Sequence, residues 1–270
     1  MHLTKEIVEL YLKGNGAPTI ALHLNIKIGK VYWVLKQNKV PLRSHKLKNT
    51  KQRTCNEQFF SQIDTQEKAY IVGLIAADGA ILKTQQASSI IKLDLHSKDM
   101  DILYKIKEVI QYTGPIKFYK SKTSYGEGEI ARLLLISDTL VQDLSLIGIS
   151  ERKSHTLGNI LKFIPLSLQV HYIRGYFDGD GSWKGNREDI AWSIMGTENT
   201  CLGIANLMTE LGIVKIIPKL QKRHEYDVVK TLEYGGRKQC KRIGNWMYKD
   251  ATIFLDRKFD KYKTQLCLTD

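Results

Sequence analysis

Two aspartates stand at equivalent places in two related apolar segments. Asp78 closes the segment IVGLIAADG, and Asp180 closes the segment IRGYFDGDG 102 residues later. The C-terminal end of a helix carries partial negative charge, so a carboxylate there is unfavourable without a nearby cation. Two adjacent carboxylates also raise each other's pKa. Because Mg²⁺ is commonly held by one or two carboxylates together with substrate phosphates, the pair predicts metal-assisted phosphodiester hydrolysis.

A single Asp-Gly pair is more typical of a turn, but two copies in the same phase favour a site. Small residues recur four positions apart in both segments, at Gly73 and Ala77 and at Gly175 and Gly179. Glycine inside a helix costs about 0.5–1 kcal/mol relative to alanine, so close contact between two helices is the expected reason. We predict that the helices pack along these four residues and bring the two aspartates together. The metal site is assigned to both aspartates with the backbone of Ala77 and Gly179.

The chain around these segments shows an internal repeat. Each is followed by alternating strand patterns and amphipathic helices, which predicts an α+β fold made of two αββαββα halves, residues 57–160 and 161–270. In one expected strand, Lys92 and Asp94 share a face opposite Leu93, and residues 215–223 are expected to form another strand. The alternative is a single α+β domain in which the similarity of the two segments is a coincidence.

Residues 1–45 follow the pattern of a trihelical helix-turn-helix domain. Thr4 is expected to cap the first helix and Gly14 to end it. The third helix, 28–40, is expected to bury Val31, Val34 and Leu35 and to expose Lys30, Lys36 and Tyr32. The unit holds seven lysines and arginines and two acids, which favours DNA contact by Lys27, Lys30 and Lys36. A small bundle that packs against the rest of the chain is the alternative.

The overall charge indicates a polyanionic partner. The 270 residues include 41 Lys plus Arg and 28 Asp plus Glu, a formal net charge of +13. Residues 46–56 contain no acid and are predicted to be a basic linker, or an arm along the DNA backbone. The four cysteines form no CxxC pair, and neither a signal peptide nor a membrane span is expected. These features predict a cytoplasmic protein of a bacterial or phage-infected cell, with an organelle also compatible.

The two glycine-flanked segments resemble the motifs of LAGLIDADG homing endonucleases over about residues 57–265. The resemblance implies a monomer with two pseudo-symmetric halves, whose sheets form a saddle over the DNA major groove. It implies that Asp78 and Asp180 bind Mg²⁺, or another divalent cation such as Mn²⁺, and that Lys153 and Lys258 assist near the scissile phosphates. Ser97 and Thr197 are expected near the site. Ala76 departs from the family pattern, which often has an acid there, whereas Asp178 keeps the acid in a structural role.

The resemblance also implies a double-strand break with short 3′ overhangs in a long asymmetric DNA target. The residues expected to contact DNA, in the body and in the N-terminal unit, are Lys27, Lys30, Lys36, Lys92, Lys117, Lys120, Lys184, Lys219 and Arg223. Two alternatives on the same fold stay open: a transcriptional regulator that binds DNA without cutting it, and an RNA-splicing maturase. Retention of both terminal aspartates argues for cleavage.

Overall fold

The chain forms two compact units in a computed structural model, Met1–Gln52 and Arg53–Asp270, here called the N-terminal unit and the body. The structure describes residues 2–13, 15–42, 53–83, 88–123, 126–222 and 227–267. Gly14, Arg223 and most of the expected linker lie outside these ranges. None of the helices in the described ranges is long and apolar enough to cross a membrane.

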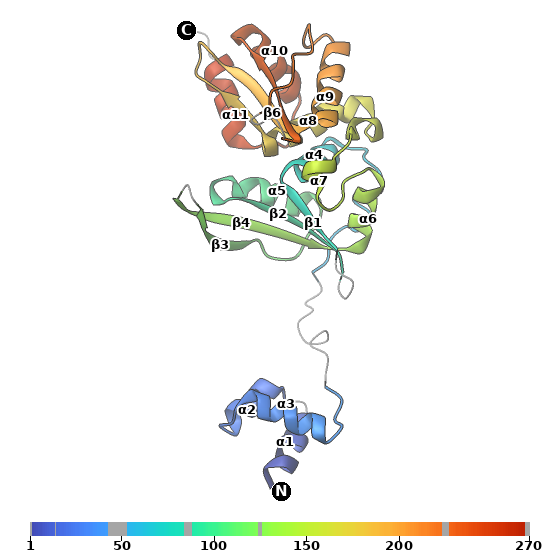
Figure 1. The fold of residues 1–270 in the computed structure, drawn as a ribbon, viewed down its shortest axis with the longest axis vertical. Coiled ribbons are helices and arrows are strands. Elements are labelled where there is room, and N and C mark those ends of the chain that lie inside the picture. Colours follow the sequence, from blue (N-terminus) through green and yellow to red (C-terminus); the bar gives the residue numbers. More distant parts are fainter. Residues whose placement is uncertain are drawn as a thin grey trace. The chain divides into compact units, whose positions relative to one another are not determined.

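The N-terminal unit consists of three short helices around a small apolar core (Figure 1). The core includes Val31, Val34 and Leu35, as predicted. Four residues separate the second helix from the third. The first helix begins at His2, so the prediction that Thr4 caps it was wrong; Leu3 packs against the core and extends the helix. The helices are α1 (His2–Leu12), α2 (Ala17–His23) and α3 (Ile28–Gln37).

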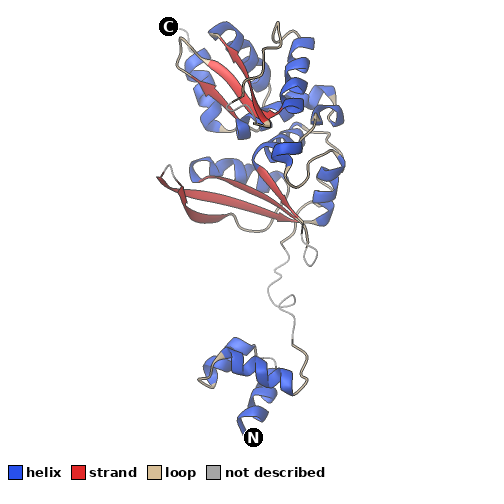
Figure 2. Cartoon of the chain, viewed as in Figure 1, coloured by secondary structure: helices blue, strands red, loops and turns tan. Residues whose placement is uncertain are grey.

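The first half of the body follows the predicted order of elements (Figure 2). Its antiparallel sheet has the strand order β1-β2-β4-β3. Helices pack on one face of the sheet, where alternate strand residues such as Leu93 and Leu133 are buried. Thr65 caps the first motif helix by accepting a hydrogen bond from the Lys68 amide. The elements are α4 (Gln66–Asp78), β1 (Gly79–Leu82), β2 (Ile90–His96), η2 (Ser97–Asp99), α5 (Met100–Val109), β3 (Lys117–Thr123), β4 (Gly126–Ile136) and α6 (Asp138–Leu146).

The second half repeats this plan with one strand fewer in the residues described. Its sheet has the order β5-β6-β7. The prediction of a strand over 215–223 was wrong for its described part, where the single pairing is a bridge from Gln221 to Thr231. Pro218 lacks a backbone N–H, which disfavours a regular ladder there. The elements are α8 (Gln169–Asp180), β5 (Gly181–Lys184), β6 (Ala191–Thr197), α9 (Glu198–Glu210), β7 (Val229–Gly235) and α10 (Arg237–Tyr248).

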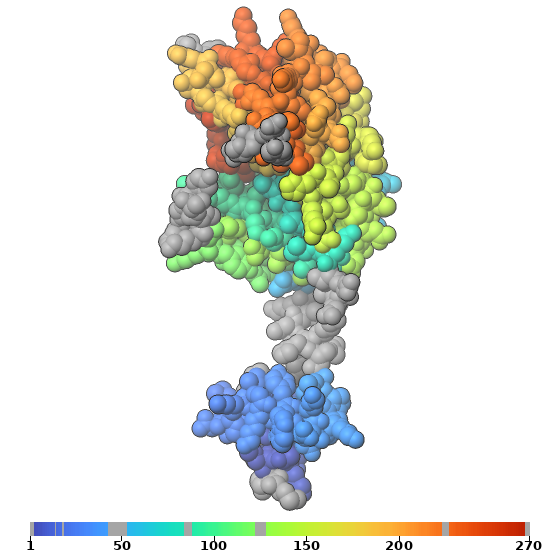
Figure 3. Space-filling view, in the orientation of Figure 1, coloured from blue at the N-terminus to red at the C-terminus, as the bar shows by residue number. Residues whose placement is uncertain are grey.

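Short helices join and close the two halves. Between the halves lie α7 (Lys153–Thr156), η3 (Ile160–Phe163) and η4 (Leu166–Leu168), and the C-terminal segment forms α11 (Asp256–Tyr262) and η5 (Lys263–Cys267). The atoms of the first half, in teal and green, meet those of the second, in orange and red, in continuous contact within the body (Figure 3). The start of α11 is tied to the first half by ion pairs of Arg257 with Asp99 at 2.9 Å and of Asp256 with Lys105 at 2.9 Å.

The motif helices α4 and α8 lie side by side between the two sheets (Figure 1). Their backbones touch at two glycines. A Cβ placed on Gly73 would collide with the carbonyl oxygen of Tyr172, and a Cβ on Gly175 would collide with that of Tyr70. The two contacts are reciprocal, because each glycine faces the other helix near the position of the other glycine. No side chain fits at either place without separating the helices.

A buried arginine strengthens the same helix pair. Arg174 of α8 is fully buried, and its guanidinium donates to the carbonyl oxygens of Ile253 at 2.9 Å and Met247 at 2.8 Å. The guanidinium carbon also lies 5.6 Å from the ring centroid of Tyr70 on α4. Because a buried cation requires such partners, Arg174 fixes α8 against both α4 and the segment that follows α10.

We predict that Gly73→Ala and Gly175→Ala each destabilise the body. In an open helix, Gly→Ala is favourable by about 1 kcal/mol. Here the added methyl meets backbone atoms, so we expect a loss of at least about 1–3 kcal/mol, as for overpacking. Thermal and urea unfolding of the full chain measure it. Gly158→Ala is the matched control, because no atom lies within 4 Å of its Cβ position. Equal melting temperatures for Gly73→Ala and Gly158→Ala would contradict the backbone contact.

Candidate active site

The ends of the motif helices place Asp78 and Asp180 in one pocket. Each helix ends at its aspartate, and Gly79 and Gly181 then take extended conformations and enter β1 and β5 directly. Both aspartates line a pocket of about 430 Å³ together with Lys153. The C-terminal ends of α4 and α8 lie close together, since a Cβ on Gly179 would lie 3.2 Å from the carboxylate oxygen Oδ2 of Asp78.

The two carboxylates lie in a partly desolvated, negatively charged environment. Burial raises the pKa of Asp78 above its usual value. Burial, and then the charge of Asp78, raise the pKa of Asp180 to about 6. The ammonium groups of Lys153 and Lys258 act in the opposite direction on both carboxyl groups. The site therefore favours a further cation, whose charge would lower the pKa of both carboxyl groups.

Lys153 reaches the site from the first turn of α7. Its Nζ donates to the carbonyl oxygen of Ala77 at 2.6 Å, and its side chain is buried. Burial lowers the pKa of Lys153, and the charges of Asp180 and Asp78 raise it. The Ala77 carbonyl, assigned to the metal site in the sequence analysis, therefore already has a donor. No hydrogen bond to the Gly179 carbonyl is found in the described residues.

Lys258 approaches from α11 and is held more tightly than Lys153. Its Nζ donates to the carbonyl oxygens of Phe177 at 2.6 Å, Asp178 at 2.8 Å and Gly181 at 2.6 Å. Burial lowers its pKa to about 8. The ammonium thus neutralises the negative C-terminal end of α8 and fixes the turn from α8 to β5. The two lysines therefore differ in their contacts, although each lies beside the end of one motif helix.

Asp178 is a structural neighbour of the pocket. Its Oδ2 accepts from the Tyr70 hydroxyl at 2.8 Å and from the Leu255 amide at 2.7 Å. Burial raises the pKa of Asp178 to about 6. It therefore connects α8 to α4 and to the start of α11, while the corresponding Ala76 is buried among apolar residues.

The two aspartates fit a hard divalent cation better than a zinc-type ion. No group of three or more His, Cys, Asp and Glu side chains that could hold a metal occurs in the described ranges. Structural or catalytic zinc needs three or four protein ligands. Mg²⁺ accepts one or two carboxylates and takes its other ligands from water and phosphate oxygens. Asp78 and Asp180, raised in pKa and open to one pocket, match that donor set.

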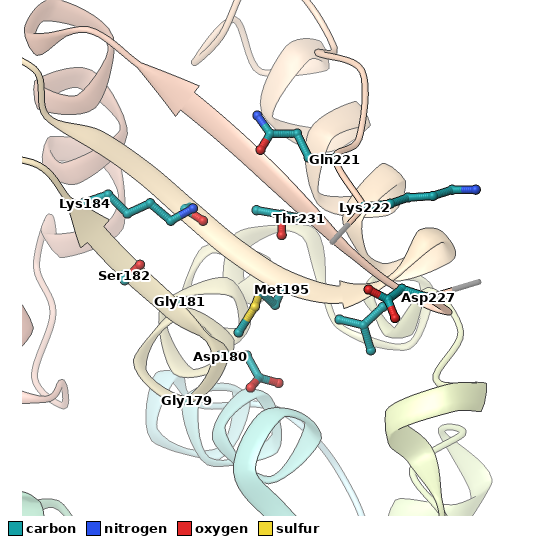
Figure 4. A pocket seen from close by; sticks show the side chains of 12 residues that line it. Gly179, Asp180, Gly181, Ser182, Lys184, Met195, Gln221, Lys222, Asp227 and Thr231 are labelled. Carbon is teal, nitrogen blue, oxygen red and sulfur yellow. The ribbon is translucent and has the colours of Figure 1, made fainter. Parts of the chain in front are cut away.

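A larger groove extends from Asp180 along the exposed face of the second sheet (Figure 4). Its volume is about 810 Å³, and Figure 4 shows the Asp180 carboxylate at its base. The strand residues that line it alternate with the buried Trp183 and Trp192. Lys184 pairs with Glu233 at 2.6 Å on this face. Hydroxyl, amide, thioether and ammonium groups line the groove: Ser182, Lys184, Ser193, Met195, Gln221, Lys222 and Thr231.

The corresponding face of the first sheet carries a charged cluster. Arg132 donates through Nε and Nη2 to both carboxylate oxygens of Asp94, at 2.6 and 2.7 Å, and Lys92 lies 3.4 Å from the same carboxylate. The Arg132 guanidinium lies 4.5 Å from the centroid of the Tyr119 ring. Sequence reasoning missed Arg132, although it alternates with the apolar Ala131 and Leu133 in its strand.

The other candidate DNA contacts lie at different places. Lys117 pairs in register with Arg132 and shares its face, whereas Lys120 pairs with Glu129 and points to the opposite face. Lys219 is exposed in the loop before Gln221. Lys30 and Lys36 are exposed on α3 of the N-terminal unit, and Lys27 is exposed at its N-cap.

Ser97 and Thr197 occupy equivalent points, each at the end of a strand. Thr197 is buried, caps α9, and donates to the Leu157 carbonyl oxygen at 2.5 Å. It also lines the pocket that contains both aspartates. Ser97 begins η2, and its side chain is half-buried.

Comparison with known proteins supports this architecture. Residues 167–245 match the model of a LAGLIDADG-like domain, and no curated protein sequence matches the chain. The homing endonuclease I-WcaI bound to its DNA recognition sequence is similar over 83% of this chain and 97% of its own, with 13% identity and a TM-score of 0.51. Mesophilic variants of the homing endonuclease I-DmoI are less similar, with 13% identity, coverage of 71% and 90%, and a TM-score of 0.45. The predicted mixed helix-and-sheet LAGLIDADG fold is therefore confirmed. The helix-turn-helix domain predicted for residues 1–45 stays a prediction.

We predict that Asp180→Asn stabilises the metal-free protein in a pH-dependent way. The folded pKa of about 6 exceeds the usual 3.8, so ionisation costs folded stability as pH rises from about 4 to 6. Two pKa units correspond to about 3 kcal/mol. We expect urea unfolding in EDTA to show a gain of roughly 1–3 kcal/mol at pH 8, and a smaller gain at pH 5. The exposed Asp101→Asn is the control, with a change of at most about 1 kcal/mol. A gain that shrinks with rising pH would refute the assignment.

We also predict that Lys258→Met destabilises the body more than Lys153→Met. The first change removes the donor to three carbonyl oxygens, of which that of Phe177 keeps the Gly181 amide, and the second change removes the donor to one. Each unsatisfied buried group costs about 1–3 kcal/mol, so the expected difference is at least about 1 kcal/mol. Urea midpoints at pH 7 measure it. Equal losses would show that the two lysines are anchored alike.

Proposed function

We propose that this chain, in which residues 167–245 form a LAGLIDADG-like domain, is a site-specific DNA endonuclease. It makes a metal-dependent double-strand break in a long asymmetric target. The proposed partner is double-stranded DNA, bound by a monomer with two pseudo-symmetric halves. The observation that carries this proposal is the meeting of Asp78 and Asp180 in one pocket at the ends of two helices whose backbones touch.

The carboxylates of Asp78 and Asp180 would hold Mg²⁺ or a similar divalent cation. When bound, such an ion supplies charge stabilisation to a phosphodiester that undergoes hydrolysis. The protein's contribution is to place both carboxylates in a partly desolvated pocket, where Lys153 and Lys258 offset part of their negative charge. We propose that each aspartate serves one DNA strand.

Lys153 and Lys258 are proposed to offset the negative charge that a DNA backbone brings to the site. The charges of both aspartates act on both ammonium groups, so the four residues form one electrostatic unit. Lys153 makes one hydrogen bond to a carbonyl, and its ammonium retains donors for a phosphate oxygen or a water. Lys258 donates to three carbonyls and is proposed to position the α8–β5 turn that carries Asp180.

The two sheet faces support an asymmetric target. A two-stranded or larger β surface fits the major groove of B-DNA, where base edges present distinct donor and acceptor patterns. The first face carries the Lys92–Asp94–Arg132 cluster, and the second carries hydroxyl and amide groups with Lys184. Because the two faces have different chemistry, they would select different half-sites.

We predict that Asp78→Asn and Asp180→Asn each abolish double-strand cleavage and preserve DNA binding. The change removes a carboxylate charge at nearly constant size. Binding sites are first selected from duplexes with a long randomised insert in EDTA, and the selected duplexes are then incubated with Mg²⁺ or EDTA. We expect the unaltered chain to cut in Mg²⁺ alone, and each variant to retain affinity within a few-fold.

Asp101→Asn is the matched control, and it should cut like the unaltered chain. Double-strand cleavage by the variant carrying both Asp78→Asn and Asp180→Asn would refute the site. Tight, selective binding by the unaltered chain without cleavage in Mg²⁺ or Mn²⁺ would instead favour a regulator that binds DNA without cutting it.

A further inference from the structure

Helix α3 of the N-terminal unit presents a tryptophan to solvent. Trp33 is 60% exposed, although Val31, Val34 and Leu35 around it in sequence are buried. At 100° per residue, Trp33 lies opposite the buried stripe, at the centre of the outward face. A tryptophan brings a large, flat, apolar ring with a polar N–H to this face, and we consider it together with the charged residues that surround it.

The residues around Trp33 on this face are small, polar or charged. Gly29, one turn earlier on the same face, has no atom within 4 Å of its Cβ position. Lys36 and Gln37, three and four residues later, are exposed beside the ring, and Lys30 lies at the edge of the face. We call Gly29, Lys30, Trp33, Lys36 and Gln37 the α3 face. It combines one large apolar ring with two cations and one amide.

The charge of this region fits a polyanion. Lys27, Lys30 and Lys36 are exposed, and no carboxylate pairs with them within the described ranges. The two acids of residues 1–45, Glu6 and Glu9, both belong to α1. The sequence from Ala17 to Val40 therefore carries four lysines and no acid. A protein partner that covered Trp33 would have to supply matching acids, whereas duplex DNA supplies phosphates on both sides of a groove.

The geometry of the helices fits the same partner. Helices α2 and α3 are separated by the four residues Leu24–Lys27, the spacing typical of a helix-turn-helix pair. In that arrangement the second helix of the pair enters the major groove, which is about 12 Å wide and admits one α-helix. In this arrangement the α3 face would enter the groove, with Lys30 and Lys36 at its edges and the Trp33 ring at its centre.

We propose that the α3 face reads a short block of base pairs in the DNA major groove, apart from the sequence that the body binds. Trp33 packs its ring against base edges, in particular the methyl groups of thymine, and Gln37 donates to and accepts from a base edge. Lys27, Lys30 and Lys36 contact phosphates. The N-terminal unit thereby adds a second sequence-reading element. This inference concerns binding alone and does not depend on cleavage.

The experiment compares sequence selection by full-length chains. Chains that carry Asp78→Asn and Asp180→Asn, with and without Trp33→Ala, select binding sites from duplexes with a long randomised insert in EDTA. We expect the parent to enrich a long motif and a separate short block on one side. The Trp33→Ala chain should enrich the long motif alone. Leu12→Ala, which removes a 66%-exposed side chain on α1, is the matched control and should keep both.

A second comparison tests the phosphate contacts. Lys36→Ala should weaken binding to all duplexes that carry the short block, and should reduce the slope of log affinity against log salt by about 0.9 per lost contact. Lys13→Ala, which removes an exposed lysine beyond α1, should leave the slope unchanged.

Two outcomes would overturn the proposal. One is enrichment of the same blocks by the parent and the Trp33→Ala chain; a lowered melting temperature for that chain would then mean that the ring packs against protein. The other is a parent chain that enriches no separate short block. If the unaltered chain does not cut the selected sites in Mg²⁺, the nuclease proposal is refuted. The proposal for the α3 face is tested by the selection alone.

Discussion

The contact between the backbones of α4 and α8 is the constraint on which the body depends. Gly73 and Gly175 lie where any side chain would collide with a carbonyl oxygen of the other helix. Because both helices end at their aspartates, the distance between the helices also sets the distance between the two carboxylates. The sheets then extend away from this pair of helices, so the position of each exposed sheet face relative to the pocket is fixed by the same contact. Arg174 and Asp178 stabilise the helix pair through hydrogen bonds to the Ile253 carbonyl and from the Tyr70 hydroxyl, respectively.

Electrostatic compensation is the second constraint. Two partly buried carboxylates at negative helix ends would destabilise the fold if they stood alone. Lys153 and Lys258 offset part of this charge, and their own burial lowers the pKa of each ammonium. The free chain therefore has carboxyl groups of raised pKa and ammonium groups of lowered pKa in one place. Such reciprocal shifts are typical of functional sites.

Much of the fold could be predicted from the sequence because the signals were local and repeated. The period of the glycines and the two Asp-Gly ends predicted the motif helices. The strand predicted over 215–223 was wrong for its described part because the segment contains Pro218, whose missing N–H disfavours a regular strand. Arg132 was missed because its partner, Asp94, lies 38 residues away, and a pairing of that kind depends on sheet register.

The site could be predicted in part. The sequence named Asp78 and Asp180 as a pair, and the structure places them in one pocket, while their role in catalysis is a proposal. The sequence predicted Lys153 and Lys258 as equivalent residues. It could not show that the Lys153 ammonium donates to one carbonyl oxygen and the Lys258 ammonium to three. The side on which a strand lysine lies also depends on register, which separates Lys117 from Lys120. Trp33 was missed, although the helical period places it opposite the buried Val31, Val34 and Leu35.

The reciprocal glycine contact has an evolutionary consequence. Tyr70 meets Gly175 and Tyr172 meets Gly73, so each half offers the other the same kind of surface, as in a two-fold symmetric dimer whose chains have been joined. The two sheets take no part in this contact, and one has four strands while the other has three in the described residues. A larger residue at either glycine would collide with the backbone of the other helix. Substitutions are therefore expected to be tolerated on the sheet faces and excluded at Gly73 and Gly175.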